Sequence, residues 1–198
     1  MTAHRAARGT ACVLAAAVPG WCCLLLFGVL PTARFTRERI EVTVRPSSIE
    51  VEGLYVYANP WPIPVTQGLK YPILSDEPHP LPDSVLVTEA DPGTGEDLRV
   101  IPTLRLGGTP YYSVTLPARA SRHIRVRYSQ RARGGSGVYL LSTTGAWRRP
   151  LESGEYLLKT VGVRITSSSY PLDGPGASSF ARRSFMPDKE WEFTWIES

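Results

Sequence analysis

Alternation of apolar and polar residues dominates the chain after residue 39 and limits the folds open to it. In residues 40–45, IEVTVR, the three aliphatic residues fall on one face of an extended strand, and Glu, Thr and Arg fall on the other. About eleven segments read as strands, most of them bounded by Gly, Pro, Asp or Ser, and no internal segment reads as a helix. This pattern predicts an all-β domain over residues 40–198, an antiparallel β-sandwich of the immunoglobulin-like or a related type, with a barrel as the alternative.

An uncharged stretch near the N-terminus predicts a membrane segment. Residues 13–30 contain no charged side chain, and a helix that crosses a bilayer core requires roughly 20 apolar residues. Two arginines precede the stretch, as they do in signal-anchor sequences. The expected layout is a cytoplasmic tail at 1–10, a transmembrane signal-anchor helix at 11–33, a basic linker at 34–39 and the single β domain beyond it.

Two other interpretations of this stretch stay open. A signal peptide would need a cleavage site with two small residues, and the best candidate, residues 31–33, carries proline at the outer position. A buried core helix would need helical partners, which the rest of the sequence does not offer. We therefore expect a single-pass protein of the cell membrane, with its C-terminal domain in the periplasm or outside the cell.

Charge and cysteine content narrow the function classes. Residues 1–39 hold five arginines and one glutamate, which account for the whole net charge of +4. The β domain is therefore neutral overall, and we expect no nucleic-acid partner. Because Cys12, Cys22 and Cys23 all lie within or beside the apolar stretch, the β domain contains no disulfide, thiolate ligand or cysteine nucleophile.

No catalytic motif is evident. The three histidines are His4, His79 and His123, and none of them belongs to an H-E-x-x-H pattern. The sequence RGGSGVY at 133–139 is not a nucleophile elbow and reads better as a glycine-rich hairpin turn. We expect a protein that is not an enzyme and that has no cofactor or metal ion.

One predicted strand has a basic face. In residues 121–131 the apolar side chains point one way, and a basic set points the other: His123, Arg125, Arg127 and Arg131. This face is a candidate for binding an acidic partner, a glycan or an anionic lipid headgroup. The alternative is an edge strand kept soluble by its charges, with arginines paired to glutamates on a neighbouring strand.

An aromatic run near the C-terminus supplies a second candidate. Trp191, Phe193 and Trp195 alternate with polar residues, so their rings share one face of a strand. They are either core residues that close a sheet or an exposed platform on which a sugar could stack. Exposure of the rings in the structure would favour the platform, and burial would exclude it.

A proline-rich loop supplies a third candidate. In residues 59–64, NPWPIP, prolines at alternate positions favour a polyproline II conformation. Pro60, Trp61 and Pro62 would then form either a rigid loop that presents a surface to a partner or a stiff connection between two strands.

Part of the sequence resembles a known type of extracytoplasmic module. The stretches VEGLYVYANPWPIPVTQGLKYPI and YYSVTLPARASRHIRVRYSQ combine a strand with an aromatic pair, an Asn-Pro turn and a later basic strand. In these respects the chain is similar to the N-terminal β-module of M1-type aminopeptidases and to uncharacterised membrane-anchored bacterial proteins. No H-E-x-x-H follows, so the resemblance implies a β-sandwich outside the cytoplasm and not a peptidase.

These observations predict a membrane-anchored interaction module that contacts a partner protein in a membrane or envelope assembly. The alternative is a module that binds a glycan or an anionic lipid headgroup. An open, uncharged sheet edge would favour the first function. A concave surface lined by Arg125, Arg127 or exposed tryptophans would favour the second.

Overall fold

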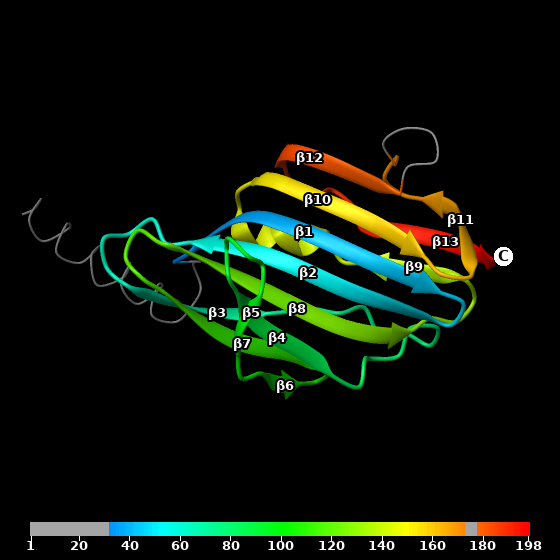
Figure 1. Cartoon of the computed structure of the whole chain (residues 1–198), viewed down its shortest axis with the longest axis horizontal. Coiled ribbons are helices and arrows are strands. Elements are labelled where there is room, and N and C mark those ends of the chain that lie inside the picture. Colours follow the sequence, from blue (N-terminus) through cyan, green and yellow to red (C-terminus); the bar gives the residue numbers. More distant parts are fainter. Residues whose placement is uncertain (1–31, 173–177) are drawn as a thin grey trace, which may run out of the picture. The chain divides into compact units, whose positions relative to one another are not determined.

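The computed structural model describes residues 32–172 and 178–198, and these fold almost entirely as strands (Figure 1). This confirms the all-β prediction for the part of the chain that is described. In chain order the elements are β1 (Arg34–Arg45), β2 (Ser48–Ala58), β3 (Val65–Lys70), β4 (Val85–Ala90), β5 (Asp97–Val100), β6 (Leu104–Leu106), β7 (Thr109–Leu116), β8 (Ser121–Arg131), β9 (Ser136–Tyr139), the 3-10 helix η1 (Ser142–Trp147), β10 (Leu151–Thr160), β11 (Val163–Ser168), β12 (Ser179–Phe185) and β13 (Trp191–Glu197).

One layer is a seven-stranded sheet in the order β12-β10-β1-β2-β8-β4-β5. β1 lies inside this sheet, antiparallel to β2 on one side and parallel to β10 on the other. The sheet is therefore mixed, which corrects the expectation of a wholly antiparallel sandwich. Alternation of apolar and polar residues is the same in parallel and antiparallel strands, so the sequence pattern did not distinguish the two.

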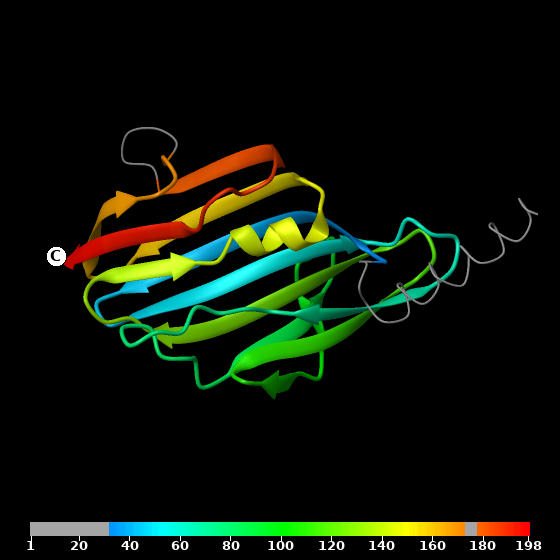
Figure 2. The ribbon, with the colours of Figure 1, turned by 180° about the vertical axis from the view of Figure 1, so that it is seen from behind.

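Two three-stranded sheets and η1 form the second layer. The sheets β11-β13-β9 and β3-β7-β6 lie over the same face of the large sheet, as the view from behind shows (Figure 2). Aromatic rings fill the space between the layers. The ring of Tyr156 in β10 stacks on Phe180 in β12 at 4.4 Å between centroids and meets Trp191 in β13 edge-on at 5.8 Å. This core positions the surfaces described below.

The basic linker expected at residues 34–39 is instead the first half of β1. Phe35 and Glu38 point into the core there and are largely buried. A β-bulge between Phe35 and Arg37 adds one residue to the strand, which breaks the strict alternation. The sequence pattern therefore becomes regular only at Ile40, where the domain was expected to begin.

The expected cytoplasmic tail, residues 1–10, lies outside the described residues, and so does the expected transmembrane segment, 11–33, apart from its last two residues. In residues 32–172 and 178–198, no helix has the length and apolarity needed to cross a bilayer. The anchor stays a prediction.

Candidate functional site

The basic strand predicted at 121–131 is β8, and its two faces are as expected. Ile124 and Val126 are fully buried, whereas the side chains of Arg125 and Arg127 lie on the opposite face of the large sheet. β8 is not an edge strand, however, because it pairs with β2 on one side and with β4 on the other. The backbone of this strand is therefore not available to pair with another chain.

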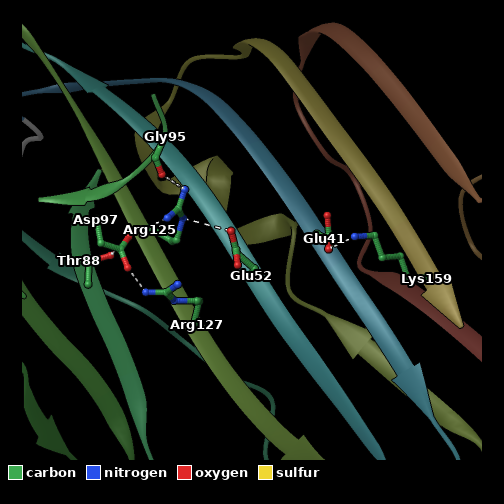
Figure 3. Close-up of polar contacts among 8 residues, drawn as sticks. All are labelled: Glu41, Glu52, Thr88, Gly95, Asp97, Arg125, Arg127 and Lys159. Atoms are coloured by element: carbon green, nitrogen blue, oxygen red, sulfur yellow. Dashed lines mark hydrogen bonds and ion pairs between the residues drawn. The ribbon is translucent and has the colours of Figure 1, made fainter. Parts of the chain in front are cut away.

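Acidic residues from neighbouring strands neutralise the centre of this face (Figure 3). Arg125 NH1 donates a hydrogen bond of 2.7 Å to Asp97 Oδ1, and Arg125 NH2 donates one of 2.6 Å to the carbonyl of Gly95. Arg127 forms an ion pair with the other carboxylate oxygen of Asp97. Arg125 Nε also lies 3.1 Å from a carboxylate oxygen of Glu52, without hydrogen-bond geometry.

Asp97 is the acid on which both arginines converge. Desolvation disfavours the charged form of its carboxyl, but hydrogen bonds from Thr88 and Arg127 and the charge of Arg125 outweigh this effect and hold its pKa below the usual range. Asp97 is thus ionised at neutral pH and cancels positive charge that an external anion would otherwise meet. This favours the ion-paired interpretation of β8 over an anion-binding one.

The other two members of the predicted basic face lie apart from this pair. His123 sits opposite Ala90 of β4, and desolvation together with the positive charge of Arg37 lowers its pKa. Arg131 is exposed at the far end of β8, opposite Ser48. The four residues therefore do not form one anion site.

The predicted aromatic platform is wrong. The exposed fractions of Trp191, Phe193 and Trp195 are 0%, 1% and 4%, so no sugar can stack on their rings. Their strand, β13, is the middle strand of its sheet, and the rings face the large sheet and close the core.

The proline loop is held in place from within. The side-chain amide of Asn59 donates hydrogen bonds to the carbonyls of Ile63, Leu116 and Pro117, and its oxygen accepts one from the backbone N–H of Trp61. Arg119 on the adjacent loop donates from its backbone to the carbonyl of Trp61. Pro60, Trp61 and Pro62 thus belong to a stiff loop, and Trp61 is half exposed at its tip.

Sequence reasoning missed a set of exposed aliphatic side chains on two edge strands that follow one another in the chain. β5 is an edge of the large sheet, and β6 is an edge of a small one. Four side chains on these strands are 55–65% exposed, and we call them the aliphatic patch: Leu98, Val100, Leu104 and Leu106. A groove of about 550 Å³ lies beside it, lined among others by Leu69, Leu104 and Tyr111. The alternation in this stretch predicted strands but not that they would be edges.

A buried acid was also missed. The Glu38 carboxyl accepts a hydrogen bond of 2.5 Å from the hydroxyl of Tyr156, and burial raises the Glu38 pKa to about 7 against the opposing effect of this hydrogen bond. Nearby, the hydroxyl of Tyr55 lies 2.6 Å from that of Tyr139 and 2.8 Å from that of Tyr71. The bonds among the three tyrosine hydroxyls join the two layers, and burial raises the pKa of each tyrosine, so these groups are neutral at neutral pH.

His79 has a structural role, because both of its ring nitrogens have partners within the domain. Its Nδ1 lies 2.7 Å from a carboxylate oxygen of Asp76, and its Nε2 lies 2.9 Å from the carbonyl oxygen of Ser136. With both ring nitrogens engaged and the ring buried, this histidine fastens the proline-rich segment 71–84 to β9. In the parts of the chain that are described, no cluster of His, Cys, Asp and Glu has the arrangement of a metal site.

Comparisons with known proteins find the fold but not a family. No protein-family model matches the sequence, and no curated protein matches it. Among solved structures, a candidate nutrient-binding protein from Legionella pneumophila matches with a TM-score of 0.62 and 15% identity over 84% of this chain and 67% of the other. This likeness shows a shared fold.

Structures of an M1 zinc metallopeptidase from Deinococcus radiodurans are also among the matches. The TM-scores are 0.43 for a substrate-bound form, at 10% identity, and 0.40 for another form, at 9% identity. Each match covers 83% of this chain and 40% of the peptidase, so the chain spans less than half of that enzyme.

Proposed function

We propose that this protein is a membrane-anchored extracytoplasmic interaction module without catalytic activity, and that its β domain contacts a partner protein through the aliphatic patch. The single observation that supports the contact is that four exposed aliphatic side chains lie on two consecutive edge strands, β5 and β6. Exposed apolar groups on unpaired edges favour association with another chain.

The expected partner presents apolar side chains and an extended segment. Such a segment can add to β5 or β6 by backbone hydrogen bonds while its side chains cover the aliphatic patch. The neighbouring groove offers room for one larger side chain between Leu69 and Tyr111. Lys70 at the border of the groove is exposed, as is usual for the polar rim of a protein interface.

The proposed anchor rests on the uncharged stretch at residues 13–30, which β1 follows closely. The proposed lack of catalysis rests on the titratable groups that the fold uses for its own stability. His79 is engaged through both ring nitrogens, Asp97 is engaged by two arginines, and Glu38 is buried against Tyr156.

Native mass spectrometry of the full chain, extracted gently from its own membranes, tests this function. A double variant, Leu104→Ser with Leu106→Ser, removes the two members of the aliphatic patch that lie on β6. The matched control is Val161→Ser with Ile196→Ser, which removes two exposed aliphatic side chains elsewhere on the domain.

We expect a stoichiometric second protein with the unaltered chain and with the control, and its loss with the patch variant. A partner that remains bound to the patch variant would refute the contact. A mass that lacks the residues up to Ala33, found in the soluble fraction, would refute the anchor.

A further inference from the structure

Several segments meet at the end of the domain where β1 begins. Ala58 at the end of β2 pairs with Arg34 at the start of β1 and with Ser121 at the start of β8. The loops 59–64 and 117–120 consequently extend past the sheets at this end, on the left in Figure 1 and on the right in Figure 2. We call this the proximal end of the domain.

The bulge in β1 makes the proximal end basic. Arg34 opposes Ala58 and Arg37 opposes Val56, so the extra residue, Thr36, brings both arginines to the outer face of the large sheet. In a regular strand, residues three positions apart such as these two would point to opposite faces. Both are exposed, and neither belongs to an ion pair formed within residues 32–172 and 178–198.

Other arginines on the same face have acidic residues close to them. Arg125 and Arg127 are already ion-paired with Asp97, and Arg125 is also paired with Glu52. Arg39, the next outward residue of β1, lies opposite Glu155 of β10. Arg34 and Arg37 therefore have no acid opposite them in the strand register, and Arg45, which faces Ser48, has an ion pair with Glu50 instead.

The tip of the same end is apolar. Trp61 is 50% exposed and Ile63 is 63% exposed. The four hydrogen bonds of Asn59 fix the loop that carries them. Since the loop is already ordered, inserting these side chains into an apolar surface costs little conformational entropy.

The sequence places the proximal end next to the predicted membrane segment. The uncharged stretch ends at Leu30, four positions before Arg34, and a fully extended chain of that length spans about 13 Å. The headgroup layer on each side of a bilayer is about 5–8 Å thick. A chain anchored by this stretch thus holds its proximal end within reach of the headgroups.

We propose that the proximal end rests on the anionic lipid headgroups of the membrane, with Trp61 and Ile63 at the boundary between headgroups and acyl chains and with Arg34 and Arg37 on lipid phosphates. The proposal rests on the anchor in the proposed function. Tryptophan is enriched at this depth of a bilayer, and arginine binds phosphate through its planar guanidinium group.

The test uses the full chain in nanodiscs that contain brominated lipids, which quench tryptophan fluorescence on contact. Subtracting the emission of Trp61→Phe from that of the unaltered chain isolates the emission of Trp61, because the other four tryptophans are common to both. We expect this difference emission to be quenched in discs that contain phosphatidylglycerol. Unquenched difference emission there would overturn the proposal.

A second comparison tests the arginines. In phosphatidylglycerol discs, Arg34→Gln with Arg37→Gln should lower the ratio of docked to undocked domain by about fivefold for each arginine removed. Arg131→Gln with Arg133→Gln is the matched control, because Arg131 lies at the opposite end of β8 and both residues are exposed. Equal quenching in the two double variants would refute the headgroup contact.

The outcomes separate this proposal from the one on which it rests. A chain that does not stay with the discs lacks the proposed anchor. A chain that stays with the discs but shows no quenching of Trp61 is anchored, and only the docking of the proximal end is then wrong.

Discussion

The hydroxyl of Tyr156 in β10 donates a hydrogen bond to the buried carboxyl of Glu38 in β1, and the two residues stand 118 positions apart in the chain. This bond joins two interior strands of the large sheet that pair in parallel. Both residues are almost inaccessible to water, with exposed fractions of 1% and 6%. Ionisation of Glu38 would therefore place a charge inside the core.

We predict that stability falls as pH rises because of Glu38, whose pKa is raised from 4.5 to about 7. Below the pKa of Glu38 in the unfolded chain, the carboxyl is protonated in both the folded and the unfolded state and does not lower stability. As pH rises towards the pKa of Glu38 in the folded protein, the unfolded chain releases a proton that the folded chain keeps. Above that pKa, the free energy of unfolding is lower by on the order of 3 kcal/mol.

Glu38→Gln should remove this dependence, because the amide stays neutral and can still bond to Tyr156. Urea denaturation at about pH 5 and pH 8 measures the effect as a change in the free energy of unfolding. Glu155→Gln, an exposed carboxylate on β10, is the control and should leave the dependence intact. An equal pH dependence in Glu38→Gln and the unaltered protein would contradict the prediction.

Asn59→Ala should destabilise the domain by about 2 kcal/mol, since it leaves buried carbonyl groups without a donor. Amide hydrogen exchange at Trp61 and Ile63 should accelerate along with it, because the same side chain fixes their loop. Thr66→Ala, which removes an exposed hydroxyl contact with Thr115, should change stability by less than about 0.5 kcal/mol. Unchanged exchange in Asn59→Ala would show that the prolines alone hold the loop.

The same substitution should affect stability very differently at two of the tryptophans. Trp191→Phe removes a ring from the closed core and the hydrogen bond from its indole to Ser168, so a loss of about 2–3 kcal/mol is expected. Trp61→Phe, at the exposed loop tip, should stay within about 0.5 kcal/mol. Thermal unfolding distinguishes the two, and similar losses would contradict the assignment of Trp191 to the core.

Asp97→Asn should convert the face of β8 from neutral to anion-binding, because it frees Arg125 and Arg127 together. We expect a sulfated resin to retain this variant, and the retention should fall steeply with salt because salt screens exposed charges. Asp83→Asn changes the net charge equally at an exposed site and should show weaker retention. If the two variants elute together, net charge alone governs the binding and Asp97 does not mask these arginines.

Strands with regular alternation could be predicted from the sequence, because a buried face fixes the placement of every second side chain. The pattern around Ile124 and Val126 in β8 shows this. The start of β1 could not be predicted in the same way. Its bulge shifts the alternation, and the inward residue there is an acid, Glu38, instead of an aliphatic side chain.

Neighbours in space could not be predicted from the sequence. The pairing of Arg125 with Asp97 depends on the strand order β8-β4-β5, and periodicity carries no information about strand order. For the same reason the sequence could not show that Leu98 and Leu104 lie on edge strands. The rings of β13 could equally have faced the core or the solvent until the second layer was known.

The parallel pairing of β1 with β10 has a consequence for synthesis. β1 and β2 are adjacent in the chain and can form a hairpin as soon as both have been made. The other side of β1 has to wait until β10, far along the chain, has also emerged. During that interval a strand destined for the interior has an unpaired edge. We therefore expect the incomplete chain, and not the mature protein, to be the form that most needs a chaperone.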